Sequence, residues 1–369
     1  MRTARFRARA PLCHTFFMSF VKEMLRPLAE DGAALTREQA SAVLEEILAG
    51  NVPEVETAAL LTVMATRGEQ APELAGFVDA MRRHSVPMPF TDAERAELVD
   101  CVGTGGGGPQ TFNISCGAAL VAAAAGARVA KHGNRAVTSR CGAADVLEAL
   151  GVPIDLSPEL AVECSRETGF AFLFAPLYHP AMKALGPLRR ALGFRTIFNL
   201  VGPLTNPAHA RTQVIGVLAP SRVLLVGRTL ASLGAKRAFV VHGTDGIDEL
   251  TTTGESVVAR VEGSDTGQPE LKAARVTPEM AGLPRSTLDH FIGGDVALNR
   301  ALLYEVLTGT PGARRDVVLL NAAAVLVAAG LAGDLKEGVA RSAEAIDSGQ
   351  AAATLERLRR FGAKHATKQ

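Results

Sequence analysis

A glycine-rich turn between two apolar segments constrains the fold of this chain more than any other feature. Residues 98–102 have the length and composition of a buried strand, and Gly103–Gly108 follows them directly. Asn113-Ile114-Ser115-Cys116 then opens an alanine-rich helix that runs to Gly126. Glycines let a backbone approach an anion closely, and the first N–H groups of a helix have no partner within it. A strand, a glycine turn and a helix start in this order predict a phosphate-binding site.

A second turn follows the next predicted strand, residues 128–130. It contains Lys131, His132, Gly133, Asn134 and Arg135, and the polar turn Thr138-Ser139-Arg140 comes soon after. An ordinary turn is the alternative for the glycine cluster, and a solvated basic loop is the alternative for this one. The glycine cluster has neither the Lys-Ser or Lys-Thr of a Walker loop nor the glycine spacing of a dinucleotide fold. Two anion-binding turns predict a substrate with more than one phosphate group.

Short apolar segments alternate with helical ones from residue 98 onward. The predicted strands are 98–102, 128–130, 171–174, 214–218 and 238–242, and the predicted helices include 223–233, 318–328 and 335–346. This alternation predicts an α/β domain with a mostly parallel central sheet, whose ligands bind beyond the carboxyl ends of the strands. The two turns and the segment 242–249 all lie at such ends.

The domain boundaries follow the same change in pattern. Residues 18–90 read as helices only and predict a small helical domain, and residues 91–369 form the larger α/β domain. The proline-punctuated segment 177–207 predicts two short helices and a crossing segment that packs in part on the helical domain. Residues 1–17 are basic, and we expect a disordered extension or an upstream start, with a transit peptide as the alternative. Gly263–Pro269 is the expected flexible loop.

Composition excludes several functional classes. The net charge is +1, which disfavours nucleic acid as a partner, and no apolar run reaches the roughly 18 residues that a membrane span needs. The five cysteines are an odd number without a CxxC spacing, so neither a disulfide framework nor a zinc site is predicted. We therefore expect a cytoplasmic protein that binds no membrane.

Asp248 and Glu249 are the candidate metal ligands. They follow a predicted strand, and two carboxylates together with substrate phosphates suit Mg²⁺, to which Ser115 could add a hydroxyl. A charged loop without metal is the alternative. Cys116 lies near a helix start, where the pKa of a thiol is typically lowered, but no partner base is evident for a nucleophilic role.

With these segments placed, the chain resembles the anthranilate phosphoribosyltransferase family. The motifs GTGG, TFNIS, KHGNR, ADVLEALG, FLFAPLYHPAM, RTIFNLVGPLTNP and DGIDEL carry the resemblance, which extends from Met18 to the C-terminal helices. It implies a fold of the nucleoside phosphorylase and phosphoribosyltransferase kind and a homodimer formed through the helical domain. It also implies transfer of the phosphoribosyl group of 5-phosphoribosyl 1-pyrophosphate (PRPP) to the amino group of anthranilate, with release of pyrophosphate, in tryptophan biosynthesis.

The resemblance also implies roles for individual residues. The PRPP-binding residues would be Gly103, Gly106, Gly107, Thr111, Asn113, Ile114, Ser115, Cys116, Lys131, His132, Gly133, Asn134, Arg135, Ala136, Val137, Thr138, Ser139 and Ala143. Anthranilate would contact Gly103, Asn134 and Arg189, the last through its carboxylate. Ser115, Asp248 and Glu249 would hold Mg²⁺, with two ions in each active site. Departure of pyrophosphate needs charge neutralisation, and the amine of anthranilate is already a neutral nucleophile, so no general base is required.

Three positions depart from the family pattern. Gly107 stands where the family usually has Asp, Cys116 where it usually has Thr, and Ala143 where it usually has Ser. We expect weaker PRPP contacts but not inactivity, and weaker inhibition by excess magnesium because a carboxylate is missing from the glycine loop. Two other functions remain open at this stage: a pyrimidine nucleoside phosphorylase, and a non-catalytic paralogue that binds nucleic acid.

Overall fold

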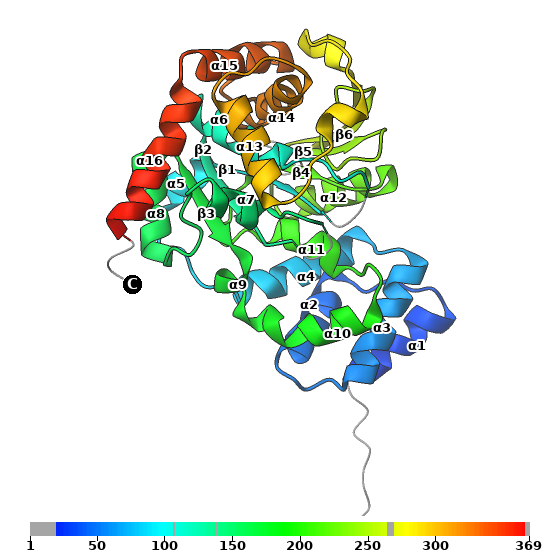
Figure 1. The fold of residues 1–369 in the computed structure, drawn as a ribbon. Coiled ribbons are helices and arrows are strands. Elements are labelled where there is room, and N and C mark those ends of the chain that lie inside the picture. Colours follow the sequence, from blue (N-terminus) through cyan, green and yellow to red (C-terminus); the bar gives the residue numbers. More distant parts are fainter. Residues whose placement is uncertain (1–19, 106–107, 137–138, 264–268, 366–369) are drawn as a thin grey trace, which may run out of the picture.

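The computed structural model describes residues 20–105, 108–136, 139–263 and 269–365. A bundle of helices lies at one end of the molecule and a larger α/β part at the other, as Figure 1 shows. Within the described residues, no helix is both long enough and apolar enough to cross a membrane.

The N-terminal segment forms four helices of the bundle. They are α1 (Phe20–Glu30), α2 (Arg37–Leu48), α3 (Glu54–Arg67) and α4 (Ala71–Arg83). Thr36 caps α2, because its hydroxyl accepts from the Gln39 N–H at 3.2 Å. The Gln39 side chain in turn accepts from the Thr36 N–H at 2.9 Å, which completes a capping box. Apolar residues at helical spacing then meet in a common core.

Within the described residues, seven strands form one sheet in the order β3-β2-β1-β4-β5-β6-β7. Their bounds are β1 (Leu98–Gly103), β2 (Arg128–Gly133), β3 (Phe170–Phe174), β4 (Thr212–Gly216), β5 (Arg237–Gly243), β6 (Ser256–Glu262) and β7 (Glu270–Val276). The first five strands are parallel, which confirms the predicted α/β class and the five predicted strands. The antiparallel pair β6 and β7 was not predicted. Most of β7 is exposed, so it lacks the apolar pattern that identifies a strand.

Helices cover both faces of the sheet. The helices of this part are α5 (Asp92–Glu97), α6 (Ile114–Ala124), α7 (Ala143–Ala149), α8 (Pro158–Thr168), α12 (Pro220–Ser232), α13 (Val296–Leu307), α14 (Ala313–Ala329), α15 (Leu335–Asp347) and α16 (Gln350–His365), with short 3₁₀ turns at η2 (Pro278–Ala281) and η3 (Leu288–Phe291). Of these, α6, α8, α12 and α14 pack directly on the strands. Side chains alternate along β4 and β5, so Val214 and Val241 join a core with α6 and α14. Ile215 and Val240 face the other way, toward α12.

The proline-punctuated segment forms α9 (Ala175–Tyr178), η1 (Pro180–Leu185), α10 (Gly186–Leu192) and α11 (Phe198–Leu204). Its apolar residues join the core of the bundle, where the Phe198 ring lies 5.7 Å from the ring of Phe77 on α4, measured between centroids. The same core continues through α12 to one face of the sheet. The bundle is therefore built from two separate stretches of chain and shares its apolar interior with the α/β part.

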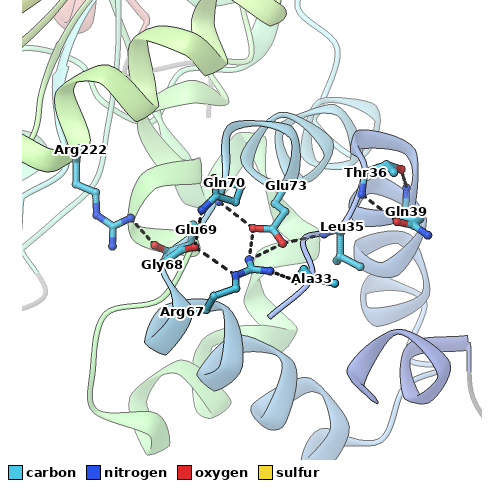
Figure 2. A network of polar contacts seen from close by, with 10 residues as sticks. All are labelled: Ala33, Leu35, Thr36, Gln39, Arg67, Gly68, Glu69, Gln70, Glu73 and Arg222. Atoms are coloured by element: carbon cyan, nitrogen blue, oxygen red, sulfur yellow. Dashed lines mark hydrogen bonds and ion pairs between the residues drawn. The ribbon is translucent and has the colours of Figure 1, made fainter. Parts of the chain in front are cut away.

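An ion pair (Figure 2) and a hydrogen bond also join the bundle to α12. Arg222 in the first turn of α12 contacts Glu69, in the loop between α3 and α4, at 2.5 Å. Arg67 pairs at 2.5 Å with Glu73, which also accepts the Leu35 N–H at 3.0 Å and so ties the loop before α2 to α4. At the other end of α12, Arg37 donates to the Ser232 carbonyl at 2.9 Å. Both ends of α12 are thus held by the bundle.

Candidate active site

The loop between β5 and β6 presents the carboxylate pair at the carboxyl end of the parallel strands. Its turn closes through the Gly243 N–H, which donates to the Ile247 carbonyl at 2.9 Å. The Asp245 carboxylate accepts from the hydroxyls of Thr251 and Thr253 at 2.6 and 2.7 Å. These bonds fold the loop back on itself around the stretch that contains Asp248 and Glu249.

Asp248 lies against the glycine turn. Its Oδ2 accepts from the Gly105 N–H at 2.9 Å. A Cβ at Gly103 would overlap this carboxylate, and a Cβ at Gly216 would overlap the Asp248 carbonyl. Gly103 and Gly216 pair across β1 and β4, so two strands end in glycine where the acid loop crosses them. This close approach is why glycines are needed at the ends of these strands.

Glu249 lies at the N-terminus of α6. Its carboxylate accepts from the Ser115 N–H at 3.1 Å, one of the N–H groups with no partner inside the helix. Burial, together with the charge of Asp248, raises the pKa of Glu249 to about 8, although nearby Lys131 and the Ser115 bond partly oppose this. Burial also raises the pKa of Asp248. The geometry therefore concentrates negative charge that a cation would stabilise.

Lys131 and Ser115 lie beside Asp248 and Glu249, and these four residues form the carboxylate cluster. Lys131 is fully buried in β2, and its ammonium donates to the Cys101 carbonyl and to the Ser115 Oγ, the latter at 3.3 Å. The Ser115 hydroxyl thus lies beside both the lysine and Glu249. Among the described residues no group of three or more His, Cys, Asp or Glu side chains is placed to hold a metal ion. Two carboxylates and one hydroxyl make an incomplete shell, which suits Mg²⁺ bound jointly with substrate phosphates.

The turn after β2 begins later in the chain than the sequence predicts. Lys131, His132 and Gly133 belong to β2 and not to the turn after it. His132 is buried with its ring 5.1 Å from that of His179, and its N–H donates to Asp100 at 3.1 Å. Because side chains alternate along a strand, Lys131 and His132 point to opposite faces. Only Lys131 of this pair reaches the carboxylate cluster.

The turn proper begins at Asn134, which is exposed. The Arg135 guanidinium pairs with Asp145 and Glu148 of α7 at 2.9 and 2.7 Å, and does not contact the carboxylate cluster. Asp145 also accepts the N–H groups of Ala136 and Gly142, both at 2.9 Å, and so fastens the turn to α7. Ser139 is exposed, and Ala143 is the first residue of α7.

The remaining predicted residues near α6 are held by the protein itself. Thr111 forms an isolated bridge with Ile292, and the Asn113 amide donates to the Cys141 carbonyl at 3.2 Å and accepts from Asn299 at 2.9 Å. Ile114 is buried at the start of α6. Cys116 is buried too, and burial raises the pKa of its thiol to about 11. The expected lowering of that pKa is therefore wrong, and a nucleophilic role loses its support.

Arg189 lies on α10, a helix whose apolar residues pack in the core of the bundle. Its guanidinium lies over the Phe198 ring, 5.5 Å from the centroid, and burial lowers its pKa. No described carboxylate pairs with it. Four predicted residues, Gly106, Gly107, Val137 and Thr138, lie outside the described residues. So does most of the expected flexible loop, Gly263–Pro269, and so does the segment 1–17.

Sequence reasoning missed the part of Asp245, Thr251 and Thr253 in shaping the acid loop. Their signal is local, because an Asp before a glycine and a run of three threonines after the acid pair are typical of a loop closed by its own side chains. The three consecutive threonines are evident in the sequence, but no role was predicted for them.

The chain is similar to known proteins along most of its length. Residues 22–85 match the helical bundle domain of the glycosyl transferase family, and residues 95–352 match its a/b domain. An anthranilate phosphoribosyltransferase of Methylorubrum extorquens (strain PA1) is 47% identical over 331 residues, 90% of this chain and 96% of that protein. Its counterpart from Moorella thermoacetica is 48% identical over 328 residues, 89% of this chain and 94% of that protein.

Solved structures are also similar. Anthranilate phosphoribosyltransferase from Thermus thermophilus is 43% identical in sequence and superposes with a TM-score of 0.84. The superposition covers 94% of this chain and all of that one. The Saccharomyces cerevisiae enzyme in complex with PRPP and Mg is 26% identical, with a TM-score of 0.82 over 94% of this chain and 99% of that one. Identity near one half across both domains leaves one conclusion: the chain belongs to the anthranilate phosphoribosyltransferase family.

Proposed function

We propose that the carboxylate cluster is the PRPP end of the active site of a pentosyl transferase, which moves the phosphoribosyl group of PRPP to the amino group of anthranilate. The observation that carries the proposal is the meeting of three elements at one point. Gly105 of the glycine turn, Ser115 of α6 and the pair Asp248 and Glu249 are joined by hydrogen bonds at the ends of β1, β4 and β5. A diphosphate leaving group needs its charge neutralised; Lys131 beside Ser115 supplies one positive charge, and the acid pair would recruit metal cations that supply more.

The acid pair and Ser115 are the proposed magnesium ligands. The raised pKa values of both carboxyl groups support this, because a divalent cation offsets their burial and mutual repulsion. Magnesium, when bound, neutralises charge on the departing pyrophosphate. Two ions per site fit two carboxylates that face different elements: Asp248 faces the glycine turn and Glu249 faces α6. Relatives support magnesium use, since the yeast enzyme has been solved with PRPP and Mg.

The remaining PRPP contacts are proposed for the turn residues and for Lys131. The Lys131 ammonium is held beside Ser115 by the Cys101 carbonyl, so its charge lies close to the proposed phosphate position. Exposed Asn134 and Ser139 remain available to a ligand, and Gly103 lies against the Asp248 carboxylate. Arg135 would have to leave Asp145 and Glu148 to contact phosphate, so we assign its contribution to the backbone of the turn.

Arg189 is the proposed anthranilate-binding residue, with Asn134 and Gly103 completing the contact. Its partly desolvated guanidinium stacks on Phe198 and pairs with no described carboxylate, so a substrate carboxylate would complete its hydrogen bonding. The arrangement needs no general base, because a neutral aromatic amine attacks as it stands. The residues then act by orienting the two substrates and by stabilising charge.

We also propose a cytoplasmic homodimer. Apolar side chains are exposed on the bundle and on the segment beside it: Phe20, Val55, Leu177 and Phe194 are 40–75% exposed. Burial of such side chains against a second copy would stabilise a dimer through the helical domain. The four described cysteines are all free thiols, which suits a reducing compartment. Light scattering on the purified protein tests the dimer.

Loss of anthranilate fluorescence tests the reaction directly. Purified protein, PRPP and a magnesium series should give substrate-dependent decay, and Asp248→Asn and Glu249→Gln should slow it while leaving the fold intact by circular dichroism. Decay that is unchanged in both variants would refute the assigned metal ligands. No decay with a folded wild type would refute the transferase, and phosphorolysis of thymidine or a salt-dependent shift of labelled DNA would then identify the alternative.

A further inference from the structure

The long helix α14 contains one polar residue in its buried stretch. Residues 317–328 are all Val, Leu or Ala except Asn321, and every one of them is buried. Asn321 has no exposed surface. A buried amide costs stability unless all of its hydrogen-bonding capacity is used, and an apolar residue of similar size would pack in this helix without that requirement. Its partners therefore indicate what it does.

The Asn321 side chain binds the backbone of the residue that follows the acid pair. Its Oδ1 accepts from the Leu250 N–H at 2.9 Å, and its Nδ2 donates to the Leu250 carbonyl at 2.8 Å. The second hydrogen on Nδ2 goes to the Val317 carbonyl, one helical turn earlier, at 2.9 Å. The amide thus fixes both backbone polar groups of one residue and is itself fixed to α14. A carboxylate in its place would set an oxygen against two carbonyl oxygens.

The position of Leu250 explains why these hydrogen bonds, together called the Asn321 clamp, are important. Leu250 lies after the end of β5 and before the start of β6, so no strand ladder satisfies its backbone. Asp248 and Glu249 precede it directly, and their negative charges repel each other. Asp245 closes the loop on itself through Thr251 and Thr253, whereas Asn321 ties the loop to a helix of the sheet core.

We propose that Asn321 is a positioning residue that holds the Asp248 and Glu249 carboxylates in place to bind magnesium with the diphosphate of PRPP. It acts through the Leu250 backbone and touches neither substrate. This inference rests on the proposed function, because it takes the acid pair as the magnesium site. It adds a residue from α14, about seventy positions further along the chain, to the determinants of PRPP affinity.

Titration calorimetry with magnesium pyrophosphate tests the inference without turnover. Asn321→Leu keeps the branch at Cγ in a somewhat larger side chain and removes all three hydrogen bonds, and Asn321→Asp turns the two bonds donated by Nδ2 into repulsive oxygen–oxygen contacts. Both should weaken pyrophosphate binding at least tenfold and raise the PRPP KM, while the anthranilate KM stays within twofold. Leu326→Ala is the matched control, since it removes a fully buried side chain from the same helix. It should lower the melting temperature without changing pyrophosphate affinity.

The outcomes separate the inference from the proposed function. If Glu249→Gln weakens pyrophosphate binding and folded Asn321→Leu does not, the clamp is refuted and the metal site stands. If Glu249→Gln binds like wild type, the assignment of the acid pair fails instead. If Leu326→Ala weakens binding as much as Asn321→Leu, Asn321 serves only the core and the inference fails. Asn321→Ser also removes the paired hydrogen bonds of the amide and adds no bulk, so it replaces Asn321→Leu in the test if that variant does not fold.

Discussion

Substitution of Gly103 by alanine should damage the site through a single methyl group. The added Cβ would lie 3.2 Å from the Asp248 Cγ and overlap Oδ2. Asp248 cannot retreat, because its carbonyl already lies against Gly216 at the end of β4. The carboxylate must therefore rotate away from the glycine turn, and its bond from the Gly105 N–H at 2.9 Å is the interaction lost.

The size of the effect follows from that bond. A hydrogen bond to a charged group contributes about 1.5–3 kcal/mol. At about 1.4 kcal/mol for each factor of ten, the expected fall in kcat/KM for PRPP is roughly 10- to 150-fold. The PRPP KM and the magnesium activation constant should both rise, and the anthranilate KM should rise by a smaller factor, because Gly103 is only a secondary contact for anthranilate. Anthranilate fluorescence measured across a matrix of PRPP and magnesium concentrations separates these parameters.

Gly362→Ala is the matched control for the added methyl. Gly362 lies in α16, where a Cβ would meet only Pro153 at an ordinary 3.4 Å. This variant should keep wild-type kinetics and stability. If Gly103→Ala also retained wild-type kcat/KM at limiting magnesium, Asp248 would have no part in PRPP binding and the assigned geometry would be wrong.

Individual contacts lead to four further predictions. The pKa of Glu249 is about 8, so magnesium must displace a proton from this carboxyl group below that pH. The magnesium activation constant should therefore fall about fivefold from pH 7 to pH 8 and level off above pH 8. The Glu249→Gln variant should lose this pH dependence. Arg189→Lys should raise the anthranilate KM roughly tenfold, with the PRPP KM unchanged in the same assay. Gly107→Asp should increase inhibition by excess magnesium, and identical inhibition curves would contradict it. Glu69→Gln should lower the free energy of unfolding in urea by about 1–3 kcal/mol, because Arg222 loses its partner.

The parts of the site that the sequence predicted are those with local causes. Gly103 and Ser115 flank a strand end and a helix start, and both features have compositional signals within a few residues. Asp248 and Glu249 follow an apolar strand, so their place at the sheet edge could be inferred. The parallel direction of five strands followed from alternation with helices.

The missed features depend on contacts between distant segments. Nothing near His132 shows that β2 continues to Gly133, because this extension depends on pairing with β3. Arg135 looks like a phosphate ligand until α7 brings Glu148 beside it. Asn321 is a single polar letter in an apolar helix, and only the fold shows that it binds a loop about seventy residues earlier.

The core shared by the bundle and the sheet has a consequence for synthesis of the chain. The helices of residues 20–83 leave the ribosome first, yet their apolar faces pack with residues 185–204 and, through α12, with Ala259 and Val261. About 180 more residues must therefore be added before that interior can close. At roughly 5–20 residues per second, the wait is on the order of 10 to 40 s. During that time the nascent bundle exposes apolar surface, to which a chaperone specific for such surface would bind.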